Sequence, residues 1–380
     1  MTTVPERLRI LSFDGGTSAA IQVRVLRQLE HDVPGVLRRA TMFAGSSDGS
    51  LVALFLALVV KDRTKTGLEI LDEAIAFSNA TVPALHVSLL DLTRGILGAS
   101  PFLGTPPCSN VNALQKVLER YYGGATLGQL ENLVVALSYD ITARKPRHFF
   151  NPPDASDRSL SLVDVGLASA SLPLLISLHG ISIGGEAHRF LDGGTIANNP
   201  AMAAVTDAMK YLTRHPSVEN GPSGERLDRI QVLSLGANEA LAPQTGEPSN
   251  CLYRLALRLI DGPPPDYRWG WIQWLLNSRF NLFDLFFFSW FLGASAEVSL
   301  ECQALLSDQQ YFRASIEIEE VAELLVLLLF WPKDRLAARY DEIAARFCAG
   351  SVYSEMVRWA REHWMAQDSS AAGSDLAPRA

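Results

Sequence analysis

The sequence predicts a three-layer α/β/α protein, with helices on both faces of a mainly parallel sheet and a mostly helical C-terminal extension. Twice in the first sixty residues, an apolar strand runs into a glycine-rich turn and then into a helix. Parallel strands joined by crossover helices produce that order. Residues 230–236, IQVLSLG, form a further strongly β-forming segment. Hydrophobic residues make up 48% of the chain and charged residues 19%, which is enough apolar material for a large core.

The individual elements follow from the spacing of apolar residues. The first strand is expected over 7–13, and a helix over 21–29 follows because its apolar residues recur on one face. A second strand over 41–44 runs into GSSDGS, and an apolar helix is expected over 51–60. Further helices are expected over 111–122, 162–170 and 201–212. Further strands are expected over 133–142 and, as a pair around a Gly-Gly turn, over 178–183 and 189–191. Residues 81–110 and 214–228 are expected to be irregular because they are rich in Pro, Gly and polar residues.

Charge and cysteine content exclude several classes of protein. The net charge of −8 argues against nucleic acid as a partner, because phosphate binding needs a basic surface. The four cysteines are far apart and form no Cys-x-x-Cys or Cys/His cluster, so we expect neither a metal site nor a disulfide framework. The apolar run 8–13 is too short for a signal peptide, and the run 285–296 is shorter than the ~20 residues that a bilayer requires. A cytoplasmic protein is expected, with peripheral membrane contact left open.

A candidate nucleophile lies in the segment FAGSSDGSLV. Ser47 is at the centre of the G-x-S-x-G pattern that Gly45 and Gly49 frame, and Ser46 is its small neighbour. A serine on a tight strand-to-helix turn adopts strained backbone angles, which only small neighbours permit. The following helix directs its positive end at that serine. An ordinary glycine turn with capping serines is the alternative.

A serine hydroxyl needs a base before it can act as a nucleophile. The seven histidines are scattered and none stands in a motif that marks a base, although a Ser–Asp–His triad stays open. Asp192 is the better candidate, because it ends an apolar strand and precedes Gly193 and Gly194. A partly buried carboxylate there has a raised pKa and can accept a proton from a hydroxyl. An Asp-Gly turn without function is the alternative.

A third candidate piece follows the first strand as Asp14-Gly15-Gly16-Thr17-Ser18. Two glycines allow successive backbone N–H groups to converge, which makes a nest for an anion such as an oxyanion. The segment lacks the Gly-Lys-Ser/Thr ending of a P-loop and the third glycine of a dinucleotide fingerprint. A nucleotide-phosphate role is therefore the weaker interpretation.

Together these motifs resemble the patatin-like phospholipase family, which joins a D-G-G-G-x-R-G loop, a G-x-S-x-G elbow and a D-G-G/A motif followed by N-N-P. In this chain they stand in the same order as DGGTSAA (14–20), GSSDG (45–49) and DGG…NNP (192–200). The stretches ASASLP, VLSLG and YFR resemble further segments of bacterial members. The resemblance covers roughly residues 8–315, and three ordered motifs are far more specific than one.

The resemblance implies a lipid acyl hydrolase that needs no metal or cofactor. Ser47 corresponds to the nucleophile, Asp192 to its base, and the backbone of Gly15 and Gly16, with Thr17, to the oxyanion hole. Supporting residues around them are expected to be Asp14, Asp48, Gly193, Gly194 and Asn199. Residues 1–315 would form the catalytic domain, 316–365 a helical extension packed on it, and 366–380 a disordered tail.

The chain also departs from the family pattern. Thr17 replaces the third glycine of the loop, Ala19 its arginine and Ala20 its last glycine, and Asp48 and Ser50 replace small residues after the nucleophile. An ionised Asp48 facing the oxyanion would oppose catalysis. We expect its side chain to face outward, where it would stabilise the first turn of its helix.

A lipid hydrolase must also contact a membrane or micelle. Residues 268–292 are rich in Trp and Phe, and we consider them either a core helix or an interfacial lid or docking surface. Two alternatives to hydrolysis remain. One is acyl transfer through the same dyad; the other is a silent or ligand-gated lipid- or partner-binding protein, which the departures at Thr17, Ala19 and Asp48 suggest. The oligomeric state does not follow from the sequence.

Overall fold

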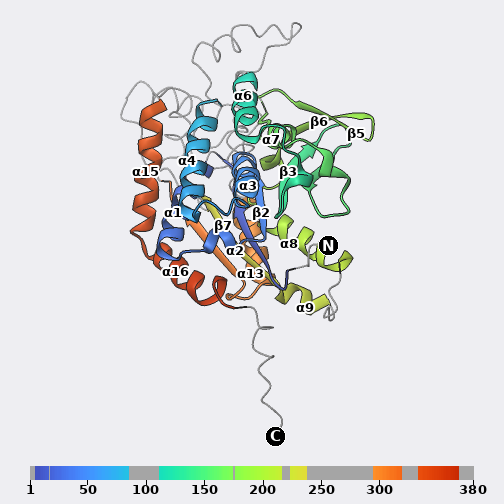
Figure 1. The fold of residues 1–380 in the computed structure, drawn as a ribbon. Helices are drawn as coiled ribbons and strands as arrows, with labels where there is room; N and C mark the ends of the chain where they lie inside the picture. Colours follow the sequence, from blue (N-terminus) through green and yellow to red (C-terminus); the bar gives the residue numbers. More distant parts are fainter. Residues whose placement is uncertain are drawn as a thin grey trace, which may run out of the picture.

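The computed structural model describes residues 5–16, 18–84, 111–173, 176–215, 223–237, 294–318 and 333–367. Within these ranges the chain forms one eight-stranded sheet with helices on both faces (Figure 1). Its strands are β1 (Leu8–Phe13), β2 (Met42–Ser46), β3 (Leu133–Asp140), β4 (Lys145–Phe150), β5 (His179–Ile183), β6 (Glu186–Asp192), β7 (Ile230–Ala237) and β8 (Tyr311–Ile316). The order is β5-β6-β3-β2-β1-β7-β8, with β4 also paired to β3.

The sheet is parallel in its centre and antiparallel at one side. Strands β3, β2, β1, β7 and β8 are parallel neighbours, whereas β4, β5 and β6 pair antiparallel. Successive side chains of a strand point to opposite faces. In β1, accordingly, Leu8 and Ile10 join one buried cluster, and Leu11 and Phe13 join the other. Two apolar layers therefore separate the sheet from its helices, and the predicted three-layer α/β/α class is confirmed.

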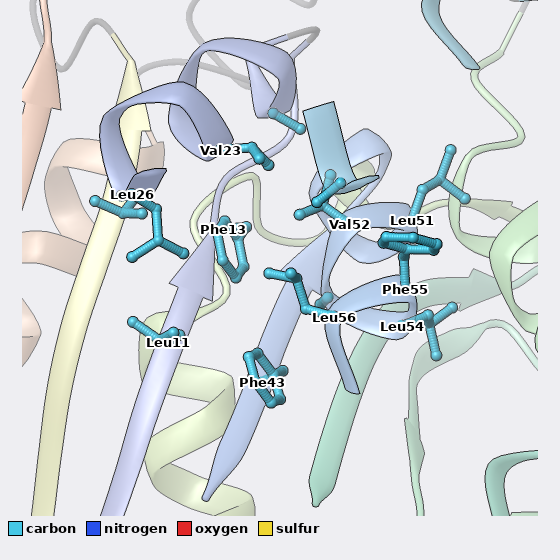
Figure 2. Packing of buried hydrophobic residues seen from close by; sticks show 14 of the residues in the cluster. Leu11, Phe13, Val23, Leu26, Phe43, Leu51, Val52, Leu54, Phe55 and Leu56 are labelled. Carbon is cyan, nitrogen blue, oxygen red and sulfur yellow. The ribbon is translucent and has the colours of Figure 1, made fainter. Parts of the chain in front are cut away.

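The helices divide between the two faces. The larger cluster packs the sheet against α1 (Ala19–Asp32), α3 (Asp48–Val59), α4 (Gly67–Ala84), α6 (Val111–Tyr122), α7 (Leu162–Ser169) and α15 (Lys333–Cys348). The other face is covered by α8 (Ala201–Arg214) and α13 (Ala294–Leu305). Figure 2 shows Leu11, Phe13 and Phe43 of the sheet facing Leu26 of α1 and Leu56 of α3. Each such large side chain, when buried, contributes roughly 1.5–3 kcal/mol.

Strand β3 sets the positions of two other strand ends. One of its edges carries β4 along Val135–Asp140, so β2 and β6 must share the other edge. On that edge Leu137 pairs with Ser46, the last residue of β2, and Ser138 pairs with Asp192, the last residue of β6. The ends of β2 and β6 therefore meet at consecutive residues of β3.

The C-terminal helices pack on the rest of the fold through buried side chains and hydrogen bonds. Helix α15 packs beside α1 (Figure 1), and it is followed by α16 (Ser351–Trp359) and a π-helical turn, Ala360–Trp364. The indole of Trp364 is fully buried and donates to the carbonyl oxygen of Val36 at 3.0 Å. Tyr353 donates to Asp32 at 2.6 Å. A mostly helical C-terminal region is thus present, while residues 368–380, where a disordered tail is expected, lie outside the described residues.

Several expected boundaries differ from the structure. Helix α3 begins at Asp48 and not at residue 51, directly after Ser47. The prediction that residues 214–228 are wholly irregular is wrong. Helix α8 extends to Arg214, and Ser223–Asp228 form the short helix α9. Part of 81–110 also belongs to α4, and the rest lies outside the described residues. Strand β4, KPRHFF, was not expected, since its charged sequence becomes a strand only by pairing with β3.

Candidate active site

Ser47 occupies a strained turn between β2 and α3. Its φ of 53° and ψ of −126° lie in a region that side chains rarely adopt, as the G-x-S-x-G pattern predicts. The glycines on either side allow the turn to close. A Cβ on Gly45 would collide with the backbone of Gly49 and Ser50, and one on Gly49 would lie 2.6 Å from the carbonyl oxygen of Asp14. Gly45 thus leaves room for the backbone of the elbow itself, and Gly49 leaves room for the backbone at the end of β1.

The elbow brings Ser47 to Asp192, 145 residues further along the chain. Ser47 Oγ donates a hydrogen bond to Asp192 Oδ2 at 2.6 Å. The other carboxylate oxygen, Oδ1, accepts from the N–H of Gly194 at 2.7 Å. Gly193 has no room for a side chain, because a Cβ there would collide with the carbonyl oxygen of Leu137 on β3. The structure thus places the two predicted residues in direct contact.

Burial changes the acidity of Asp192. The side chain is 0% exposed, and burial raises its pKa to about 7 because the ionised form loses hydration. Hydrogen bonds from Ser47 and Gly194 partly offset this, and the negative charge of Asp48 raises the pKa further. A carboxylate with a pKa near neutrality can both accept and return a proton.

The glycine-rich loop 14–18 lies beside the elbow, but it differs from the expectation in one respect. The N–H of Gly15 donates to the carbonyl oxygen of Asn198 at 3.0 Å, so it is not directed at an oxyanion as predicted. A Cβ on Gly15 would lie 2.7 Å from Asn198 Oδ1 and 2.9 Å from the Cβ of Ser47, which shows how closely the loop approaches the serine. The N–H of Gly16, a residue with a φ of 85°, donates no hydrogen bond to another described residue. Thr17 lies outside the described residues.

Asp14 holds the start of this loop through a buried ion pair. Arg313 on β8 donates to both of its carboxylate oxygens, at 2.8 and 2.6 Å, and also to Ser234 Oγ at 2.8 Å. Both charged side chains are almost fully buried. Gly236 lies against this pair, where a Cβ would collide with Arg313 and Asp14. The motif YFR indicated Arg313 as part of a family pattern, but its contact with Asp14 could not be read from the sequence.

The expectation that Asp48 faces outward is wrong. The residue is 6% exposed, and its Oδ2 accepts from the backbone N–H of Ala19, the first residue of α1, at 3.0 Å. The first backbone N–H groups of a helix have no partner within the helix, and the elbow lies close enough for this carboxylate to accept from one of them at the start of α1. Asp48 therefore bridges the elbow and the end of the glycine-rich loop.

The neighbouring residues Asn198 and Asn199 contact different parts of the fold. The N–H of Ala201 donates to Asn199 Oδ1 at 3.0 Å, so Asn199 supports the start of α8 on the far side of the sheet. Asn198, which the sequence did not single out, is buried against Gly15 and Gly16. Gln22 was also missed. It reaches back from α1 and donates to the carbonyl oxygen of Asp14 at 3.1 Å and to Ser18 Oγ at 2.7 Å.

Histidine has no contact with this serine in the described part of the chain. The rings of His31, His148, His179, His188 and His215 each face an aspartate other than Asp192. His86 lies outside the described residues. The same part of the chain contains no cluster of His, Cys, Asp or Glu that could hold a metal ion.

Comparison with known proteins agrees with these motifs. A family model described as Patatin-like phospholipase matches residues 11–205, which is 195 of the 380 residues. The protein belongs to the patatin-like phospholipase family. The matched region of this family member contains the glycine-rich loop, the elbow and Asp192.

Individual relatives are distant. The chain is 26% identical to CotR of Bacillus subtilis (strain 168), over 62% of this chain and 64% of that protein. It is 24% identical to a cGAMP-activated phospholipase of Escherichia coli (strain TW11681), over 62% and 65%. Patatin-like protein 2 of Arabidopsis thaliana is 22% identical over 84% and 80%. The match thus spans about two thirds of the length of the first relatives.

One solved structure aligns with most of this chain, but the two folds superpose poorly. VipD from Legionella pneumophila matches 95% of this chain and 68% of its own, with 12% identity and a TM-score of 0.37.

No helix among the described residues has both the length and the hydropathy to cross a bilayer.

Proposed function

We propose that this patatin-like protein hydrolyses fatty-acyl esters of lipids, with Ser47 as the nucleophile and Asp192 as the general base. The observation that carries the proposal is the 2.6 Å hydrogen bond from the strained Ser47 to the buried Asp192. Membership of the patatin-like phospholipase family supports a lipid ester as the substrate.

The reaction begins when Asp192 Oδ2 takes the proton of Ser47 Oγ as this oxygen attacks the ester carbonyl carbon. The C–O bond of the leaving alcohol then breaks, and the alcohol receives the proton that Asp192 carries. Water enters next, and Asp192 accepts one of its protons while the oxygen attacks the acyl-enzyme. The fatty acid leaves and Ser47 regains its proton, so no cofactor is consumed.

Negative charge on the carbonyl oxygen needs backbone donors during both steps. Helices α1 and α3 begin next to the site, at Ala19 and Asp48, and their positive ends favour an anion there. Because Gly15 donates to Asn198, we assign the oxyanion contact to the N–H of Gly16, and Thr17 stays a predicted second donor. Each such donor is worth about 10²–10³ in kcat.

Ser46 offers a matched control for testing the dyad. It neighbours Ser47 and is fully buried, and its hydroxyl has no hydrogen-bond partner among the described residues. Wild type, Ser47→Ala, Asp192→Asn and Ser46→Ala are incubated with phospholipid vesicles, mono- and triacylglycerols and short p-nitrophenyl esters. We expect fatty-acid release to vanish in Ser47→Ala, to fall about 10²–10⁴-fold in Asp192→Asn and to persist in Ser46→Ala.

Mass mapping of a fluorophosphonate adduct identifies the nucleophile independently of the natural substrate. An adduct on Ser47 supports the proposal. An adduct on Ser46, or fatty-acid release that survives Ser47→Ala, would contradict it.

One relative favours a ligand-gated form of the same activity. The Escherichia coli relative is named as a cGAMP-activated phospholipase, although it shares only 24% identity with this chain. Fatty-acid release is therefore measured with and without cGAMP. A rise with cGAMP that Ser47→Ala abolishes would support gating, whereas an unchanged rate would exclude gating by this ligand.

Contact with a lipid surface is the remaining part of the proposal. The Trp- and Phe-rich segment 268–292 lies outside the described residues, so its role as a docking surface stays a prediction. Vesicle co-sedimentation of Ser47→Ala, which binds without turnover, measures the peripheral contact that lipid hydrolysis requires. Absence of binding to every vesicle composition would favour a monomeric ester as substrate.

A further inference from the structure

Asp48 lies where two helix N-termini meet. It is the first residue of α3, directly after Ser47, and its carboxylate accepts from the N–H of Ala19, the first residue of α1. Ser18, at the N-cap position of α1, makes no side-chain cap hydrogen bond of its own. An N-cap acceptor normally satisfies one of the exposed donors of a helix. Asp48 supplies that acceptor from the elbow.

The first turn of α1 is tied to the glycine-rich loop. Ser18 Oγ donates to the carbonyl oxygen of Gly15 at 3.0 Å, and Gln22 donates to the carbonyl oxygen of Asp14 at 3.1 Å. Any shift of this turn therefore moves Gly15. Little movement is tolerated there, because a methyl group on Gly15 would come within 2.9 Å of the Ser47 Cβ.

Charged and titratable groups from three directions face this carboxylate. Asp192 lies across the elbow, and the charge of Asp48 raises its pKa. Tyr340 of α15 is buried near Asp48, whose charge raises the pKa of this phenol beyond the effect of burial. Arg24 of α1 lies 5.7 Å from the Tyr340 ring centroid. The N-termini of α1 and α3 stabilise the charge of Asp48.

We infer that Asp48 is a positioning residue: it caps α1 across the elbow and thereby fixes the glycine-rich loop against Ser47. This inference rests on the proposed function, since it assigns the loop to the reaction at Ser47. It also gives a role to one departure from the family pattern, because the Asp48 carboxylate accepts from the backbone N–H at the start of α1.

Fluorophosphonate labelling of Ser47 tests the inference without a lipid substrate. The variants are Asp48→Ala, which removes charge and acceptor, and Asp48→Asn, which keeps an acceptor oxygen. Glu30→Ala is the matched control, because Glu30 is also buried and accepts from the N–H groups of Gly35 and Leu37 at the far end of α1. Thermal unfolding of each variant sets a temperature at which all are folded.

We expect Asp48→Ala to label about 10–100-fold more slowly than wild type, because the loop loses its alignment. Asp48→Asn is expected to lose less than about threefold, while the midpoint of its pH–rate profile falls as the negative charge beside Asp192 disappears. This fall reports the charge of Asp48 alone, so the positioning role is tested by the labelling rates above both midpoints, where Asp48→Asn should restore most of the rate that Asp48→Ala loses. Glu30→Ala is expected to label at the wild-type rate.

The inference and the proposed function fail in different ways. Labelling of Asp48→Ala at the wild-type rate, or an equal loss in Glu30→Ala, would overturn the role of Asp48 while Ser47 remains the nucleophile. If the folded wild type does not label at Ser47, the proposed function fails and the inference fails with it.

Discussion

The elbow at Ser47 and the glycine-rich loop at Asp14–Ser18 are built from similar parts but are held in different ways. Both follow a central parallel strand and both precede a helix. The elbow is held by close backbone packing, because Gly45 lies against the backbone of Gly49 and Ser50, and Gly49 lies against the carbonyl oxygens of Phe13 and Asp14. The loop depends on distant segments: β8 provides Arg313, the turn after β6 provides Asn198, and α3 provides Asp48.

This difference predicts that the two pieces tolerate different substitutions. A turn whose glycines lie against backbone atoms has no room for a side chain at either position. A loop that is held from outside can exchange its third glycine and its arginine, as Thr17 and Ala19 do, provided that outside contacts hold its place. The following changes test the contrast, beginning with the largest expected effect.

Arg313→Met should be the most destabilising change, because it leaves the Asp14 carboxylate buried without its partner. We expect the free energy of unfolding to fall by about 3–5 kcal/mol. Urea unfolding measures this loss. The double variant Asp14→Asn/Arg313→Met should recover part of it, since no buried charge remains. A loss below about 1 kcal/mol in the single variant would show that the loop does not depend on this pair.

Asp192→Asn should stabilise the fold at alkaline pH. The folded-state pKa of about 7 lies above the ordinary aspartate pKa of 3.8, so the wild type loses stability as pH rises between these values. We expect Asp192→Asn to gain about 2–4 kcal/mol relative to wild type between pH 4 and pH 8. Unfolding at the two pH values tests the sign. An equal difference at both would contradict a raised pKa.

The same shift predicts a pH profile for catalysis. Asp192 accepts a proton only when ionised, so kcat/KM should rise with pH about a midpoint near 7. Ester hydrolysis from pH 5 to 9 measures that midpoint. A rate that is already maximal at pH 5 would exclude Asp192 as a base with this pKa.

Gly49→Ala tests the close packing of the elbow against the end of β1. The new methyl group would meet the carbonyl oxygens of Phe13 and Asp14, so we expect a loss of about 2–3 kcal/mol. Gly124 is the control, because nothing lies within 4 Å of a Cβ there and its backbone needs no positive φ. Chemical unfolding of both alanine variants should show a loss only for Gly49. Similar stabilities would mean that the elbow can relax.

Gln22→Leu should have the smallest effect. It removes the two hydrogen bonds to the Asp14 carbonyl oxygen and Ser18 Oγ, and we expect a loss of about 1–2 kcal/mol. Thermal unfolding measures the stability, and fluorophosphonate labelling shows whether the loop has moved. Unchanged values for both would show that the other contacts hold the loop without Gln22.

The sequence predicted the fold class and both members of the Ser47–Asp192 pair, because each lies in a short motif at a strand end. It predicted less well wherever a partner comes from elsewhere. The orientation of Asp48 was wrong because Ala19, its hydrogen-bond donor, belongs to another turn. Gly15 was expected to donate to an oxyanion, but Asn198 takes that donor after the chain has returned across the sheet.

The sequence by itself determined the place of the strained turn at Ser47, since the Gly-Ser-Ser-Asp-Gly motif marks it. It also indicated the first strands and helices through the spacing of apolar residues, but not β4, which pairs with β3. Only the tertiary structure decided which groups meet. Ser138 of β3 places Asp192 beside the elbow, and Arg313 reaches Asp14 from β8. These contacts depend on the pairing of strands that lie far apart in the chain, a property that no local pattern contains.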